Sequence, residues 1–262
     1  MLKTIFLGDI VGKVGRQFIK SNLPVLKEKY APDLVIANGE NSAGGLGIDP
    51  GTAEEIYGAG VDLITTGNHI WQRRQVYDYL DKNSHRIVRP INFPSGVPGK
   101  GAMVWEWNGL RVGVLNSIGR VFMPQLADCP FKATTEALEG ELADCQIRIV
   151  DFHAEATSEK VAMGWHCDGL ASLVVGTHTH VQTADERILP GGTAFISDLG
   201  MCGPRNSVIG VKREIAVQRF IDSLPGRFDV ASGPAMLNGV FCEIDSQNGK
   251  ALTIERINLF TE

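Results

Sequence analysis

Short runs of apolar residues recur along the chain, and polar residues follow each run almost directly. Runs of this length, bounded by glycine and small polar residues, are typical of buried strands. The runs and the polar residues after them are Thr4–Leu7 with Asp9; Leu34–Ala37 with Asn38, Glu40 and Asn41; Leu63–Thr66 with Asn68 and His69; Ile147–Val150 with Asp151 and His153; and Leu170–Val175 with His178 and His180. Because ligands of open α/β sheets bind at the carboxyl ends of strands, we expect these polar side chains to share one edge.

Helical periodicity separates the first three runs. Residues 14–30 carry apolar side chains at roughly helical spacing, interrupted by Pro24. A second helix is expected to open with Asp49 as its N-cap and Pro50 at the first helical position, and Thr52 with Glu55 has capping-box spacing as an alternative start. A third is expected near residues 72–80. Alternating strands and helices favour an α/β fold with parallel crossovers.

The pattern changes after residue 100. Asn108-Gly109 between two apolar stretches predicts a hairpin over residues 101–117. Residues 118–145 are polar and contain proline, and we expect them to form a small inserted lid beside the sheet. We interpret residues 1–262 as a single domain. The remaining expected elements are a strand at 194–198, helices near 158–165 and 214–223, and an antiparallel strand pair, 236–244 with 252–259.

Composition narrows the classes of function. A formal net charge of −5 argues against broad nucleic-acid binding, which depends on basic surface. The five cysteines are odd in number and lack C-x-x-C spacing, so a reducing compartment fits better than a disulfide framework. No apolar run approaches the ~20 residues of a membrane span, and the amino terminus shows no signal peptide. We therefore expect a cytoplasmic protein without membrane attachment; its oligomeric state stays open, a homo-oligomer included.

The polar residues at the strand ends have the chemistry of metal ligands. Carboxylate, carboxamide and imidazole groups together suit Mn²⁺, Fe²⁺ or Zn²⁺. Seven such residues are too many for one ion and suit two ions ~3.5–4 Å apart, with Glu40 as the bridging ligand. The candidate ligands are Asp9, Glu40, Asn41, Asn68, His153, His178 and His180. Such a pair of ions binds phosphate oxygens and lowers the pKa of a bridging water, which favours phosphoester hydrolysis.

Each residue taken alone has a simpler explanation. Asp9 could be a helix cap, Asn68 a turn residue and His153 a buried core histidine. The set is more informative than its members, since unrelated structural roles would not all fall at strand ends. Gly8–Lys13 resembles a P-loop but is one residue short, and Gly44–Gly47 lacks dinucleotide-binding spacing. We interpret Gly44–Gly47 as a flexible loop beside the metals.

The same residues carry a resemblance to the calcineurin-like metallophosphoesterases. Gly67-Asn68-His69 matches the G-N-H block of that superfamily, His153 its isolated histidine, and residues 176–180 a form of its G-H-x-H block. The chain departs from that superfamily at two places: Val11 replaces the usual histidine, and Gly39-Glu40-Asn41 replaces Gly-Asp. With these departures the sequence resembles the bacterial YmdB-type phosphodiesterases. The resemblance covers essentially the whole chain. It implies a layered sheet sandwich flanked by helices.

The resemblance also implies ligand sets and an activity. Asp9, Glu40, Asn41 and His180 would hold the first metal, and Glu40, Asn68, His153 and His178 the second. His69 would be the general acid. A di-iron or di-manganese site would hydrolyse cyclic nucleotides, most often 2′,3′-cyclic AMP, by attack of a metal-bound hydroxide on phosphorus.

Three functions are compatible with these residues. The leading one is a two-metal phosphodiesterase acting on a small-molecule cyclic nucleotide, with residues 118–145 covering the substrate and Phe122 and Met123 contacting the base. The second is a nucleotidase or phosphomonoesterase on the same site. The third is a metal-bound regulatory or RNA-associated protein whose hydrolysis is incidental.

Overall fold

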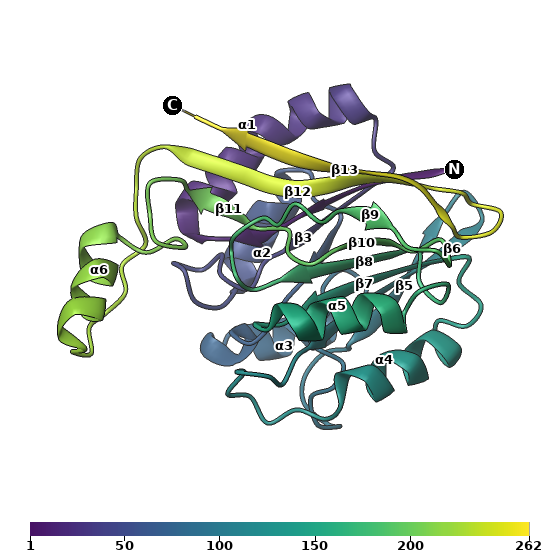
Figure 1. Cartoon of the computed structure of the whole chain (residues 1–262), viewed down its shortest axis with the longest axis horizontal. Helices are drawn as coiled ribbons and strands as arrows, with labels where there is room; N and C mark the ends of the chain where they lie inside the picture. Colours follow the sequence, from purple (N-terminus) through teal and green to yellow (C-terminus); the bar gives the residue numbers. More distant parts are fainter. Residues whose placement is uncertain (262) are drawn as a thin grey trace.

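Two β-sheets pack face to face, and helices cover their outer faces (Figure 1). The computed structural model describes residues 1–261. In the first sheet the strand order is β2-β11-β12-β1-β3-β4, with β13 paired to β12; in the second it is β5-β6-β7-β8-β10-β9. The first-sheet strands are β1 (Leu2–Leu7), β2 (Asp9–Ile10), β3 (Leu34–Asn38), β4 (Leu63–Thr65), β11 (Met201–Pro204), β12 (Ala235–Ile244) and β13 (Ala251–Phe260). Those of the second are β5 (Ala102–Trp107), β6 (Leu110–Ile118), β7 (Ile147–His153), β8 (Leu173–Thr177), β9 (Arg187–Ile188) and β10 (Ala194–Ile196).

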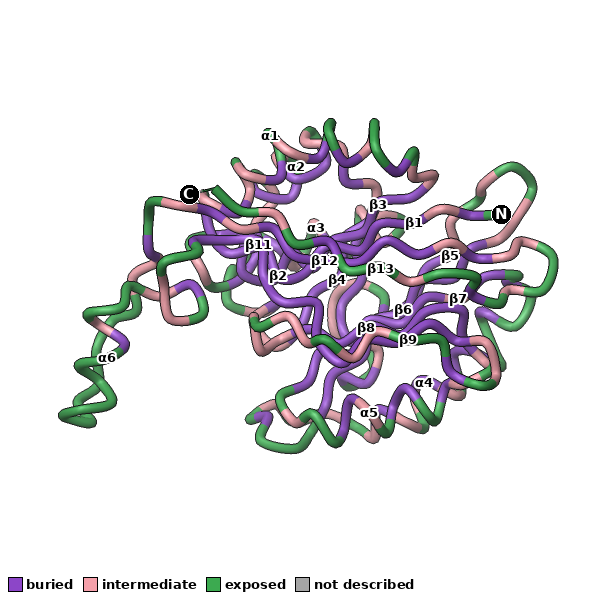
Figure 2. Tube along the Cα trace, turned by 45° about the horizontal axis from the view of Figure 1, so that its top comes forward, coloured by how far each residue is buried: buried purple, intermediate pink, exposed green. Residues whose placement is uncertain are grey.

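The apolar runs of the sequence are strands buried on both faces. In β1, Leu2 and Phe6 pack between the two sheets, whereas Ile5 and Leu7 face the helices on the first sheet. Successive strand residues point to opposite faces, so a strand covered on both sides must be apolar throughout. Figure 2 shows these strands as the buried centre of the molecule.

The helices divide between the two outer faces. Those on the first sheet are α1 (Gly12–Tyr30), α2 (Pro50–Gly58) and α3 (Val76–Lys82), the last preceded by the short 3₁₀ helix η1 (Ile70–Gln72). Those on the second are α4 (Pro130–Glu139) and α5 (Thr157–His166). The remaining helix, α6 (Arg213–Asp222), projects from the body (Figure 1). No helix within residues 1–261 is long and apolar enough to cross a membrane.

Several local predictions are confirmed. Asp49 caps α2 through a reciprocal pair of hydrogen bonds with Thr52, and Pro50 is its first residue. The β5–β6 hairpin turns at Asn108 and Gly109, both with positive φ, as a tight hairpin of this kind requires. The interruption expected at Pro24 is absent, because α1 continues through this residue to Tyr30.

Residues 118–145 differ from the expected insertion. They comprise the end of β6, a loop and α4, and they form the connection between the parallel strands β6 and β7. Helix α4 packs on the outer face of the second sheet through Ala137 and Leu138. Parallel strands are joined by a crossover of a dozen or more residues, which usually contains a helix. The polar, proline-containing sequence of this segment did not reveal that helix.

Candidate metal centre

The strand ends of both sheets meet at one place and bring all seven candidate ligands together. Asp9 lies in β2 directly after β1, Glu40 and Asn41 follow β3, and Asn68 follows β4. From the second sheet, His153 is the last residue of β7, and His178 and His180 follow β8. The candidate ligands therefore come from both sheets, and the fold must be complete before they meet.

A first group consists of Asp9, Asn41 and His180. The His180 Nδ1 donates to the Ile209 carbonyl oxygen at 2.8 Å, so Nε2 is the ring nitrogen directed inward. That Nε2 lies 3.1 Å from the Asn41 amide and 3.9 Å from Asp9 Oδ1. Asp9 Oδ1 is buried and has no hydrogen-bond partner within residues 1–261. A buried carboxylate oxygen without a partner is costly, and a cation at this point would satisfy it.

A second group consists of Asn68, His153 and His178. His153 Nε2 lies 2.8 Å from Asn68 Oδ1 and 3.1 Å from His178 Nδ1. The other nitrogen of His178 lies 3.1 Å from the Glu155 carboxylate, so its Nδ1 is the nitrogen that faces the group. Oxygen and nitrogen atoms with lone pairs thus converge here, an arrangement suited to a cation.

Glu40 stands between the two groups. Its Oε1 lies 3.1 Å from the Asn41 amide nitrogen of the first group and 3.2 Å from His153 Nε2 of the second. Its Oε2 accepts a hydrogen bond from the His69 backbone at 3.0 Å. Potential ligand atoms of Glu40, His153 and His178 all lie within 4.8 Å of one another. The residues present therefore fit metal binding.

Burial and mutual charge shift the protonation of these residues. Burial opposes the charged form of Glu40, but His153 beside it holds the pKa of Glu40 below its usual value. Burial likewise opposes the imidazolium of His153, and Glu40, Asp9 and Asp151 together raise its pKa. Burial, reinforced by His153, lowers the pKa of His178 to about 3. A metal cation would replace the proton that otherwise compensates these carboxylates.

The loop after β8 is not an extended segment, in which side chains two residues apart would point the same way. His178 and His180 have φ angles of 103° and 65°, in the left-handed region. The two imidazoles therefore do not converge on one point: His178 joins the second group and His180 the first. Such backbone costs on the order of 1–3 kcal/mol per residue and persists only where surrounding contacts impose it.

Asp198 and Lys160 supply those contacts, and neither residue was predicted from the sequence to belong to the site. Asp198 Oδ2 accepts hydrogen bonds from the Thr179 backbone nitrogen at 3.1 Å and from its hydroxyl at 2.8 Å. Lys160 of α5 pairs with the same oxygen at 2.5 Å, and both side chains are buried. Asp198 could have been predicted as a site residue, because it follows the apolar run of β10. No sequence pattern pointed to Lys160.

A second buried network orients His153. Its Nδ1 donates to the Thr177 hydroxyl at 2.9 Å, and that hydroxyl donates to Asp151 Oδ1 at 2.7 Å. Asp151 also accepts hydrogen bonds from Thr65 and Asn38. The chain of donors leaves His153 Nε2 as the nitrogen directed at Asn68 and Glu40.

Gly67 shows how closely the groups approach. A Cβ atom at this position would lie 2.4 Å from the His153 ring and 2.5 Å from Glu40 Oε2. Only glycine leaves this space free, which accounts for glycine at position 67.

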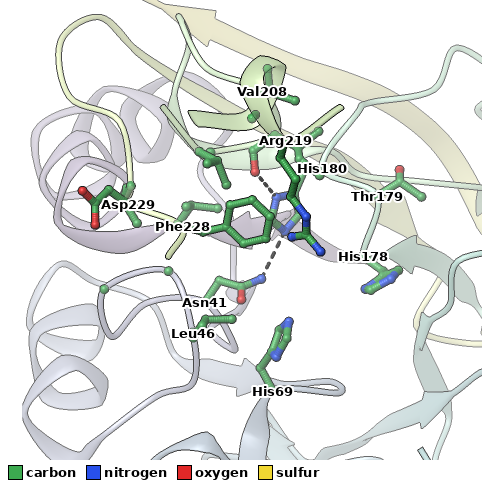
Figure 3. A pocket seen from close by; sticks show the side chains of 18 of the residues that line it. Asn41, Leu46, His69, His178, Thr179, His180, Val208, Arg219, Phe228 and Asp229 are labelled. Atoms are coloured by element: carbon green, nitrogen blue, oxygen red, sulfur yellow. Dashed lines mark hydrogen bonds between the residues drawn. The ribbon is translucent and has the colours of Figure 1, made fainter. Parts of the chain in front are cut away.

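A cavity of about 740 Å³ opens onto both groups (Figure 3). Its lining includes Glu40, Asn41, His178 and His180, and the His69 side chain points into it. Gly44 and Gly45 line it, as expected of a loop beside the site.

The opposite wall comes from residues 208–230, which were not predicted from the sequence to belong to the site. No described residue of 118–145 lines the cavity, so the covering role of that segment stays a prediction. Met123 is buried in the core and Phe122 is 85% exposed outside the cavity, so neither lies where a base contact was expected.

Two facing sheets with these residues between their strand ends define the metallophosphoesterase class of fold. Within that class the chain belongs to the YmdB-like protein family, whose sequence profile matches residues 5–257.

Similar proteins cover nearly the whole chain. A relative from Bacillus subtilis (strain 168), named 2′,3′-cyclic-nucleotide 2′-phosphodiesterase, is 48% identical over 256 residues, 98% of this chain and 96% of its own. A crystal structure from Mycoplasma pneumoniae, described as a novel phosphatase, has 42% identity and a TM-score of 0.93, covering 99% of this chain and 93% of its own. A structure from Thermus thermophilus, described as a hypothetical protein, has 39% identity and a TM-score of 0.92 and matches 100% of both chains.

Proposed function

We propose that this protein is a two-metal phosphodiesterase that opens 2′,3′-cyclic nucleotides. The position of Glu40 is the main support for the proposal. A single carboxylate oxygen, Oε1, lies within 3.2 Å of Asn41 in the first group and of His153 in the second. A carboxylate so placed can bridge two ions. The name of the Bacillus subtilis relative supports the substrate class.

The ligand sets follow from the two groups. Asp9, Asn41, His180 and Glu40 would hold one ion; Asn68, His153, His178 and Glu40 would hold the other. Asn41 presents its amide nitrogen to His180 in this structure, and rotating the amide by 180° would present its oxygen instead. The imidazole, carboxylate and amide set suits iron or manganese, which we propose as the bound metals.

When bound, the two ions supply the positive charge that holds the phosphate oxygens and activates water for attack on phosphorus. His69 projects into the same cavity without belonging to either group, and we assign it the proton that the leaving 2′ oxygen requires. Burial lowers the pKa of His69, which makes its imidazolium a stronger acid toward a leaving alkoxide. Gly44 and Gly45, without side chains, allow the ribose to approach the loop backbone closely.

The free cysteines of the chain favour a cytoplasmic location. None of the five cysteines forms a disulfide within the described chain, and Cys145, Cys167, Cys202 and Cys242 are buried. Unpaired buried thiols are typical of reducing compartments, so we infer a cytoplasmic location.

A substrate panel under Mn²⁺ tests the proposal: 2′,3′-cyclic AMP, 3′,5′-cyclic AMP, a linear diester and AMP. We expect 2′,3′-cyclic AMP to be opened fastest and to give the 3′-phosphate, because its five-membered ring is compact and strained. Faster release of phosphate from AMP would make the protein a phosphomonoesterase. Metal binding without turnover of any of the four would favour a regulatory protein.

A further inference from the structure

The cavity has two chemically different ends. One end is formed by the metal-site residues. The other is formed by the segment 208–230, which carries α6 and contributes mostly apolar side chains, among them Ile209, Phe220 and Phe228. In Figure 1 helix α6 of this segment stands apart from the two sheets, so the helix is an addition to the layered fold.

Arg219 of α6 is the one lysine or arginine among the described residues lining the cavity. Its guanidinium lies 4.6 Å from the centre of the Phe228 ring, and Figure 3 shows both side chains projecting into the cavity. Arg219 forms no ion pair with a carboxylate of residues 1–261. The adjacent Asp229 pairs instead with Lys212 at 3.3 Å and Arg227 at 3.8 Å.

Arg219 is exposed to solvent, so its unpaired charge is accessible to a ligand that enters the cavity. Phe228 holds the guanidinium plane through a cation–π contact, which fixes its orientation without neutralising its charge. Flat guanidinium and aromatic faces are the surfaces on which bases stack in nucleic-acid and nucleotide sites. Since metal-site residues occupy the opposite end, the pair faces whatever part of the substrate extends away from the phosphate.

We propose that Arg219 and Phe228 form the subsite for the nucleobase. The inference rests on the proposed function, because it places the cyclic phosphate at the metal-site end. In a 2′,3′-cyclic nucleotide the base leaves the ribose at C1′, away from the phosphate, and a cavity of about 740 Å³ accommodates both parts. Recognition is by stacking on a largely apolar wall, so the subsite favours purines over pyrimidines by ring area and discriminates little between adenine and guanine.

The test compares substrates with and without a base. Arg219→Ala, Phe228→Ala and wild type are assayed with 2′,3′-cyclic AMP and with 1-O-methylribose 2′,3′-cyclic phosphate. Arg213→Ala is the matched control, since Arg213 is exposed on the same helix and pairs only with Glu214. We expect each subsite variant to raise KM for 2′,3′-cyclic AMP roughly tenfold, the scale of one stacked base, while kcat and the base-free substrate change little.

Equal losses on both substrates would show a general effect on the site and overturn the inference, as would no loss on either. Equilibrium binding of 3′-AMP and of ribose 3-phosphate separates the subsite from the reaction. If wild type opens no cyclic nucleotide, the proposed function fails. A preference for 3′-AMP that both variants abolish would still support the subsite, and equal binding of the two ligands by wild type would overturn it. Thermal melting of each variant checks that α6 changes leave the fold intact.

Discussion

Asn68 and His69 are neighbours in the sequence but lie in different surroundings. The Asn68 side-chain oxygen is 2.8 Å from His153 Nε2, whereas His69 Nδ1 has no hydrogen-bond partner in the described chain. His69 directly precedes the short helix η1, so a turn directs its side chain into the cavity. This separation supports a ligand role for Asn68 and a proton-donor role for His69.

Replacing His69 with alanine should remove proton donation and leave metal binding intact. General-acid assistance is typically worth ~10²–10⁴-fold, so we expect a loss of rate on that scale, largest for substrates with poor leaving groups. Steady-state kinetics and elemental analysis of the purified variant measure the two effects. His85→Ala, at an exposed position, is the control. Loss of metal from His69→Ala would instead make His69 a ligand.

The Thr177 hydroxyl connects Asp151 to His153, and its removal should weaken metal binding. In Thr177→Val the side chain keeps its shape, but His153 Nδ1 loses its acceptor and the ring its fixed orientation. Outer hydrogen bonds of this kind are worth about 10–100-fold in metal affinity. Calorimetric titration of the metal-free protein with Mn²⁺ measures the change, and Thr177→Ser should bind as wild type does. Wild-type affinity in the valine variant would contradict the role assigned to the hydroxyl.

At the level of elements, the sequence predicted what local patterns determine. Apolar runs gave the central strands, and Asp49 with Pro50 gave the start of α2. The left-handed loop after β8 could not be predicted, because it is imposed by Asp198, which follows β10, and by Lys160 from α5. From the sequence alone, a lysine in a helix is expected to be exposed to solvent. Lys160 is buried because α5 packs on the second sheet.

The Lys160–Asp198 pair should contribute strongly to stability as well as to the loop. Lys160→Met leaves the Asp198 carboxylate buried without its partner, and breaking a buried pair costs about 3–5 kcal/mol in the free energy of unfolding. Urea denaturation followed by circular dichroism measures this loss. The double variant Lys160→Met with Asp198→Asn should recover part of it, because the unpaired charge is then absent. A loss below about 1 kcal/mol would mean that the pair behaves as a surface one.

For the whole molecule, the site depends on both sheets meeting at one edge. Asp9, Glu40 and Asn68 come from the first sheet, and His153, His178 and His180 from the second. The sequence predicted this set because polar residues followed each buried run. It did not predict the cavity wall at 208–230, since neither α6 nor the chain around it carries a pattern that relates it to the strand ends.

The central claim is that two ions are bound per chain and that Glu40 contacts both. Elemental analysis of the reconstituted protein, wild type against Glu40→Gln, tests it most directly, with Glu106→Gln at an exposed position of β5 as the control. We predict two metal ions per chain in wild type and in the control. Glu40→Gln should bind less at both sites and lose most activity. A single well-occupied ion in a fully active wild type, or two ions retained by Glu40→Gln, would contradict the account.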